Sequence, residues 1–214
     1  GLLSKNFDGL QNDLDKMDGV FLKRGQYTPA LEDDKKWTFA PLAKVGDKVI
    51  AGDWLGNVKE NWLDHKIMVP FKFEGEYTVE SVAKEGEYTI NDVVATLKDK
   101  EGELHNVTMV QKWPVKLAVK AYKNKPRPFR LLETGIRVID TMNPILEGGT
   151  GFIPGPFGTG KTVIQHSLAK HADADIIIMA ACGERANEVV EIFSEFPHLE
   201  DPRTGRSLYE RTTI

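Results

Sequence analysis

The sequence predicts two domains of different class: a β-rich, barrel-like domain in residues 1–125 and the first part of an α/β domain in residues 126–214. Three observations predict this division. Short apolar stretches separated by glycine-containing turns fill the first part. A basic, proline-rich segment, KNKPRP, lies at 123–128 and is typical of a linker. Beyond it, strand-like and helix-like patterns alternate, as expected of an α/β domain.

The β-rich part contains a repeated hairpin pattern. EGEYTV at 74–79 recurs as EGEYTI at 85–90, and a weaker copy, EGEL, lies at 101–104. A repeat of this length suits one strand plus one turn, which predicts a meander of hairpins. The alternative is that similar turns select similar residues.

Composition, charge and the N-terminal sequence argue against several classes of protein. The net charge of −4 argues against nucleic acid as the main partner, because phosphate binding needs a basic surface. The N-terminus lacks the basic and apolar regions of a signal peptide. The single cysteine, Cys182, excludes an internal disulfide and fits a reducing compartment. We therefore expect a cytoplasmic protein. The five histidines show no metal-ligand spacing, and none is assigned to a metal.

The α/β part is predicted element by element. Residues 152–154 predict a strand leading into a glycine-rich loop, and 163–171 predict a helix. The apolar run at 176–182 is typical of a strand buried on both faces. Residues 186–196 place apolar side chains at helical spacing, and Pro197 is expected to end that helix.

Residues 155–162 read GPFGTGKT, a full match to the phosphate-loop pattern G-x-x-x-x-G-K-[ST]. Glycines let backbone N–H groups turn toward phosphate oxygens, and the following helix adds its positive dipole end. Lys161 is expected to reach the β- and γ-phosphates, and the Thr162 hydroxyl to hold Mg²⁺. The predicted nucleotide-binding residues are Gly155, Pro156, Phe157, Gly158, Thr159, Gly160, Lys161, Thr162 and Val163. The motif indicates a P-loop NTPase without choosing its reaction.

A carboxylate follows the predicted strand at 176–182. Ligands of open α/β sheets bind beyond the carboxyl ends of the strands, so Glu184 and Arg185 are expected beside the phosphate loop. Glu184 could activate the water that attacks the γ-phosphate, and Arg185 could hold charge on the phosphates. Alternatively, Glu184 opens the next helix, where an acid suits the helix dipole. Position alone leaves both interpretations open.

Several motifs together resemble the catalytic A subunit of the V/A-type (vacuolar/archaeal-type) rotary ATPases. In the second part they are TGIRVIDT at 134–141, GGT at 148–150, GPFGTGKT at 155–162, GERANE at 183–188, EFP at 195–197, TGR at 204–206 and ERT at 210–212. In the first part, DGLQ at 8–11, KW at 36–37 and the Gly-Asp pairs at 46–47 and 52–53 resemble the bulge segment of that subunit. The resemblance spans nearly the whole chain.

The resemblance implies roles for the site residues. Glu184 would be the catalytic glutamate, Arg185 a phosphate-contacting residue, and Lys161 and Thr162 the phosphate and magnesium residues. The implied activity is that of an ion-transporting ATPase that hydrolyses or makes ATP, binds ATP or ADP with Mg²⁺, and moves H⁺ or Na⁺. Thr159 stands where eukaryotic relatives typically carry a cysteine linked to redox control, so the resemblance implies that this control is absent.

The resemblance also implies partners and further sequence. The partners would be the B subunits of an alternating A3B3 ring, the central-stalk subunits and a peripheral stalk, in the cytoplasmic V1/A1 sector that attaches to the membrane. Both ends of the chain are expected to continue into a longer protein that supplies the Walker B aspartate and the adenine pocket. We therefore expect an open sheet edge at Ile214 and little activity from these 214 residues alone.

Two other functions fit the phosphate loop. One is a nucleotide-binding but non-catalytic ring subunit, which an intact Lys161 together with Glu184 argues against. The other is a RecA-like P-loop motor of another class, such as an RNA-binding transcription terminator or an export ATPase. The acidic charge and the long β-rich segment argue against both of these motors.

Overall fold

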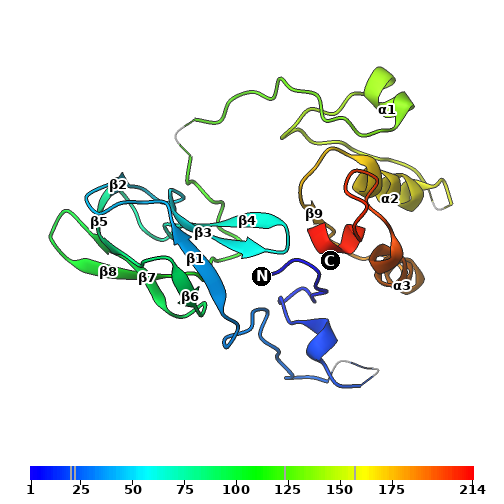
Figure 1. Ribbon diagram of the computed structural model, residues 1–214. Helices are drawn as coiled ribbons and strands as arrows, with labels where there is room; N and C mark the ends of the chain where they lie inside the picture. The colour runs from blue at the N-terminus through cyan, green and yellow to red at the C-terminus, as the bar shows by residue number, and fades with distance from the viewer. Residues whose placement is uncertain (20, 22, 123, 157) are drawn as a thin grey trace. The chain divides into compact units, whose positions relative to one another are not determined.

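The computed structural model describes residues 1–19, 21, 23–122, 124–156 and 158–214, which divide into two compact units (Figure 1). Unit 2 is the continuous segment Leu31–Lys125. Unit 1 combines Gly1–Ala30 with Pro126–Ile214. The first thirty residues, grouped by sequence with the β-rich part, thus cluster with the part that carries the phosphate loop.

Unit 2 consists of two four-stranded antiparallel sheets, in agreement with the predicted β-rich class. Their strand orders are β4-β3-β1-β6 and β2-β5-β7-β8. The strands are β1 Trp37–Pro41, β2 Lys48–Val49, β3 Trp54–Glu60, β4 Leu63–Met68, β5 Tyr77–Val82, β6 Gly86–Tyr88, β7 Val93–Lys98 and β8 Leu104–Thr108.

The meander predicted from the EGEYT repeat is wrong for β5 and β6. These strands carry the two copies, yet β5 pairs with β2 and β7, whereas β6 pairs with β1. The side chains explain the separation, because Val79 of β5 and Tyr88 of β6 pack into different apolar clusters. The two copies also differ locally, because Gly75 lies in a turn with a φ of +87° before β5, whereas Gly86 lies within β6.

Two apolar clusters form the core of unit 2. One contains Ala43, Val49, Leu55, Val69, Phe73, Val79, Ala95, Leu97 and Val107. The other contains Trp37, Phe39, Val58, Ile67, Ile90 and Val94. Close packing also requires glycine at position 56, since a Cβ at Gly56 would lie 2.2 Å from the ring of Phe39. Alternate strand residues thus point inward and are covered within the unit.

Unit 1 is mixed α/β, as predicted. Its elements are η1 Leu14–Lys16, α1 Arg137–Met142, α2 Lys161–His171, β9 Ile177–Ile178, α3 Ala186–Glu195, η2 Phe196–His198, η3 Leu208–Arg211 and β10 Thr212–Thr213, where η denotes a 3₁₀ helix. Helices α2 and α3 confirm the two predicted helices, and Pro197 lies two residues beyond the last residue of α3, within η2. None of the helices in the described part of the chain is long and apolar enough to cross a membrane.

The strands of unit 1 are shorter than predicted. Residues 152–154 have no regular secondary structure, and the run at 176–182 forms only β9. Ile177 packs with Ile192, Phe196 and Leu208, but Ile178 is 75% exposed. The prediction of a strand buried on both faces is therefore wrong here. Among the described strands β9 pairs with β10 alone, in parallel; this pairing satisfies backbone groups along one edge and covers neither face of the strand.

The N-terminal residues occupy the other edge of β10. Lys5 pairs in parallel with Thr213, and the backbone N–H of Phe7 donates to the carbonyl of Ile214 at 2.8 Å. The N–H of Ile214 donates to the carbonyl of Lys5 at 3.2 Å, and that of Ser4 to Thr212 at 2.9 Å. The expected open edge at Ile214 is therefore wrong, because residues 4–7 satisfy its backbone groups.

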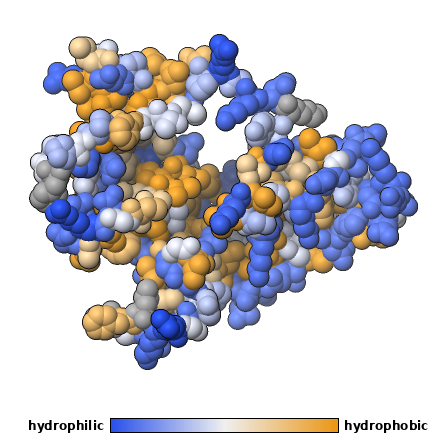
Figure 2. All heavy atoms as spheres, turned by 180° about the vertical axis from the view of Figure 1, so that it is seen from behind, coloured by the Kyte–Doolittle hydropathy of each residue, from blue (hydrophilic) through white to orange (hydrophobic). Residues whose placement is uncertain are grey.

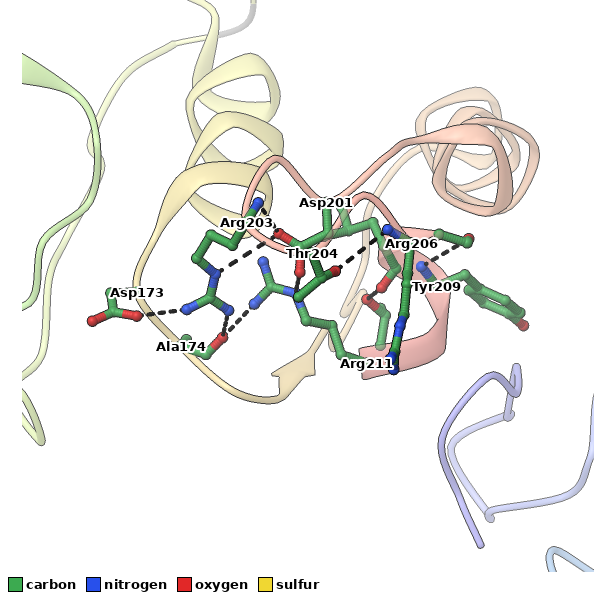
Figure 3. Close-up of polar contacts among 11 residues, drawn as sticks. Asp173, Ala174, Asp201, Arg203, Thr204, Arg206, Tyr209 and Arg211 are labelled. Carbon is green, nitrogen blue, oxygen red and sulfur yellow. Dashed lines mark hydrogen bonds and ion pairs between the residues drawn. The ribbon is translucent and has the colours of Figure 1, made fainter. Parts of the chain in front are cut away.

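An ionic cluster anchors the segment before β10 (Figure 3). Asp201 and Arg211 are almost fully buried, with Oδ2 and Nε 3.0 Å apart, and Arg211 also donates to the carbonyl of Ala174. Arg203 donates to Asp173 at 2.5 Å and to the same carbonyl at 2.6 Å. Burial lowers the pKa of Arg211, and the charge of Asp201 opposes that shift. The two arginines thereby tie this segment to the chain that follows α2.

Candidate functional site

The phosphate loop is a tight turn that depends on its glycines. Gly158 and Gly160 have φ angles of +78° and +80°, in the left-handed region that favours glycine. A Cβ at Gly155 would lie 2.5 Å from the Thr159 hydroxyl oxygen. That hydroxyl donates to the carbonyl of Pro156 at 2.8 Å and closes the turn. The spacing of the glycines in the motif therefore has a steric cause in this loop.

The loop leads directly into the N-terminus of α2. Gly160 occupies the cap position and has no side chain to accept hydrogen bonds from the first-turn N–H groups. Those groups and the positive end of the helix dipole form a site that suits an anion. Val163 lies in this first turn with its side chain exposed. The backbone here can receive phosphate oxygens without rearranging a cap.

Lys161 lies across the loop. Its Nζ donates to the carbonyl of Gly155 at 2.7 Å and to that of Pro156 at 2.9 Å. Charged phosphate oxygens are stronger acceptors for an ammonium group than neutral carbonyls are. The side chain is thus held where an anion in the loop would compete for it.

Thr162 contacts a carboxylate that the sequence analysis missed. Its hydroxyl donates to Oε2 of Glu188 at 3.1 Å, which joins α2 to the first turn of α3. A hydroxyl and a carboxylate are the hard oxygen ligands that Mg²⁺ prefers, so this pair fits a magnesium ion. No sequence signal singles out Glu188, because acids in the first turn of a helix are common.

Glu184 and Arg185 lie between β9 and α3. Arg185 takes the cap position of α3 with an extended backbone, and the acid of the first turn is Glu188. Glu184 therefore precedes the helix cap. The sequence also allowed Glu184 to be the acid in the first turn of this helix. In the structure, Glu188 occupies that position instead.

A cavity of about 300 Å³ in unit 1 gathers part of the predicted site. Its polar lining residues are Thr162, Gln165, Glu184 and Glu188, and its apolar lining includes Leu168, Ile177 and Ile192. Among the described residues, the cavity lining leaves out Lys161 and Arg185, although each is adjacent in sequence to a lining residue. Phe157 lies outside the described residues. The structure thus brings the predicted magnesium residue and the predicted catalytic glutamate to one cavity.

Two family models match the chain. The ATP synthase alpha/beta subunit barrel-sandwich domain matches residues 28–116, and the nucleotide-binding domain of the ATP synthase alpha/beta family matches residues 135–214. The first match covers most of unit 2, and the second begins just before α1 and includes the cavity.

Curated relatives agree with these models. The V-type ATP synthase alpha chains of Borrelia recurrentis and Chlamydia abortus are each 51% identical to this chain over its whole length, and V-type ATP synthase alpha chain 1 of Treponema pallidum is 50% identical. The chain covers 38%, 36% and 37% of these relatives, respectively. It therefore spans a little over a third of their length. With both domains in order and this identity throughout, the chain belongs to the ATP synthase alpha/beta family, with V-type ATP synthase alpha chains among its relatives.

Proposed function

We propose that this chain is the nucleotide-phosphate-binding part of the catalytic subunit of a V/A-type rotary ATPase. The whole protein would hydrolyse or make ATP, coupled to translocation of H⁺ or Na⁺. The observation that carries the proposal is the cavity shared by Thr162, Glu184 and Glu188 beside a complete phosphate loop. The 51% sequence identity to a V-type ATP synthase alpha chain supports the proposal.

The phosphate loop would hold the nucleotide. Backbone N–H groups at 158–162 and the start of α2 would contact the phosphate oxygens of ATP or ADP. Lys161 would exchange its two carbonyl acceptors, those of Gly155 and Pro156, for the β- and γ-phosphates. The loop therefore already contains the cation that it would present to the substrate.

Thr162 and Glu188 would hold Mg²⁺ together with water. The ion, when bound, would neutralise part of the charge on the β- and γ-phosphates. The Thr162 hydroxyl would then turn its lone pairs toward the ion, and Glu188 would bind directly or through a water molecule. Thr162 is the residue that the sequence predicted for this role, and its hydrogen bond to Glu188 supports including Glu188 in the proposed site.

Glu184 would position and activate the attacking water. It lines the cavity and lies outside the helix that follows it. A carboxylate in that place can accept the proton of a water aimed at the γ-phosphate. Arg185, next along the chain, would hold charge on the transferred phosphate. A further arginine would come from a neighbouring B subunit.

The whole protein would work within a complex. We propose B subunits as its neighbours in an alternating A3B3 ring, with central-stalk and peripheral-stalk subunits as further partners. The assembly would lie in the cytoplasm as the V1/A1 sector, attached to the membrane through other subunits. Nucleic acid is not among the proposed partners, in keeping with the net charge of −4.

The test compares two substitutions in the full-length subunit of the assembled complex. Lys161→Ala should abolish turnover and weaken nucleotide binding, because the phosphates lose their cation. Glu184→Gln should keep nucleotide binding but lower turnover at least about 100-fold, because the amide cannot accept a proton. ATP binding and phosphate release are measured on the same samples.

Glu195→Gln is the matched control, since Glu195 is an exposed acid at the far end of α3. It should leave both measurements unchanged. Wild-type turnover in Glu184→Gln would contradict the catalytic role. A complex in which Lys161→Ala also turned over normally would favour the non-catalytic ring subunit.

A further inference from the structure

The turn that joins β7 to β8 in unit 2 gathers three metal-ligating side chains, apart from the nucleotide site. They are Asp99, Glu103 and His105, and one ligand atom of each lies within 4.8 Å of the others. No other group of three or more histidine, cysteine or acidic side chains this close occurs in the described part of the chain. The sequence analysis considered histidine spacing alone and therefore missed a group with one histidine.

The two carboxylate oxygens of Asp99 have different hydrogen-bond partners. Oδ1 accepts the backbone N–H groups of Glu101 and Glu103 at 2.9 and 2.8 Å, which fixes the turn. Oδ2 lies 2.9 Å from Nε2 of His105. One oxygen is thus structural, and the other faces the imidazole.

His105 is held by aromatic neighbours. Its ring centroid lies 5.6 Å from that of Phe73 and 5.6 Å from that of Tyr77, with the Tyr77 ring edge-on. Its side chain remains 32% exposed, so solutes can reach the ring. Glu103 is exposed and can rotate toward the other two ligands. Two of the three ligands are therefore already placed, and only the third has to adjust.

We propose that Asp99, Glu103 and His105 bind a divalent first-row transition ion of the Zn²⁺ class. Zinc bonds to imidazole nitrogen and carboxylate oxygen are about 2.0–2.2 Å long, so a separation of 2.9 Å between two ligand atoms fits one ion. Imidazole favours such ions over Mg²⁺ and Ca²⁺, which prefer oxygen ligands. Metal binding needs an Nε2 without a proton, so the proton of the hydrogen bond with Asp99 would be released to solvent, and water would complete the coordination.

A second hairpin of unit 2 supplies the matched control. The β3–β4 turn also pairs a histidine with an acid, His65 Nδ1 with Glu60 Oε2 at 2.7 Å. No third ligand joins that pair among the described residues. The two hairpins therefore differ in the one feature on which the proposal rests.

The experiment titrates Zn²⁺ into the 214-residue chain by calorimetry, without nucleotide. All samples carry Cys182→Ser, because the exposed thiol is itself a zinc ligand. The starting protein should bind one Zn²⁺ at this turn. His105→Gln should weaken binding at least about tenfold, and Glu103→Gln by a smaller factor. His65→Gln should leave the affinity unchanged, and millimolar Mg²⁺ should not compete.

Glu103→Gln keeps the test valid if His105→Gln disturbs folding, because an exposed side chain is replaced and the backbone bonds of the turn remain. Tryptophan fluorescence checks the fold of unit 2, which contains all four tryptophans. No saturable Zn²⁺ binding by the starting protein would overturn the proposal. Equal binding by the starting protein, His105→Gln and Glu103→Gln would overturn it as well.

Discussion

The two units differ in how their apolar side chains are covered. Unit 2 buries its own in two clusters between its sheets, whereas the cluster of unit 1 consists of four buried residues from β9, α3, η2 and η3. Large exposed apolar side chains of unit 1 include Val138, Met142, Phe152, Val163, Ile178 and Val190. In Figure 2, apolar patches are correspondingly larger over unit 1. The one burial prediction made from sequence, at 176–182, was wrong in the unit that covers fewer of its apolar side chains.

The ionic cluster tests whether unit 1 depends on polar anchoring where its apolar core is small. Asp201→Ala leaves the charge of Arg211 buried without its partner, so we expect a loss of about 3–5 kcal/mol in the stability of unit 1. Hydrogen exchange of α2 and of residues 199–213 measures the loss. Tryptophan fluorescence of unit 2 should stay unchanged.

Asp173→Ala is the control, because Asp173 pairs with Arg203 at the surface and is 68% exposed. Exposed pairs contribute about 0–1 kcal/mol. Equal losses in the two variants would show that burial of the Asp201–Arg211 pair is not what stabilises this segment.

The core of unit 2 should respond to a cavity independently of unit 1. Leu97 is fully buried on β7, and Leu97→Ala is expected to lower the free energy of unfolding of unit 2 by about 2–5 kcal/mol. Urea unfolding followed by tryptophan fluorescence measures it. Leu104→Ala, at an exposed position of β8, should change the same quantity far less. Faster hydrogen exchange in α2 or α3 of Leu97→Ala would contradict the independence of the units.

Alkaline pH should weaken unit 1 through Tyr209. Burial raises the pKa of this tyrosine to about 12, and the charges of Asp15 and Asp13 add to the shift. A raised pKa means that the folded state keeps the proton longer than the unfolded state does. The stabilisation is therefore complete below pH about 10 and is lost between about 10 and 12.

The absorbance of phenolate at 295 nm tests this effect directly. The difference between wild-type and Tyr209→Phe titrations should show one midpoint near 12. The variant should also lose less stability in unit 1 over that pH range. A difference titration centred near 10 would contradict the burial of this hydroxyl.

The local elements were the part of the fold that sequence could predict. Helix α3 follows from apolar spacing and from Pro197, and α2 follows from the phosphate-loop motif that precedes it; both signals are properties of a few neighbouring residues. The prediction of a buried strand at 176–182 was wrong, because a buried strand needs packing neighbours that the local apolar pattern does not reveal. The predicted strand pairing in unit 2 was wrong for the same reason, as β5 and β6 show.

The candidate site divides in the same way. The loop glycines and Lys161 were predictable, because the motif itself is a local steric requirement. Glu188 was not, because acids in the first turn of a helix are common and only its contact with Thr162 distinguishes it. Residues that act through a contact across the fold carry no signature in a single sequence.

The pairing of Lys5 with Thr213 has a consequence for how the protein is made. Unit 2 is an insertion between the two segments of unit 1, so one strand pairing joins nearly the whole length of the chain. Such long-range pairing forms slowly, because the chain loses the entropy of loop closure before the contact contributes any stability. During synthesis on the ribosome, residues 4–7 emerge before unit 2, and their partners at 212–214 emerge after it. Unit 2 can therefore fold in between and shorten the loop, while the early segment waits as an unpaired strand that a chaperone or a neighbouring chain could capture.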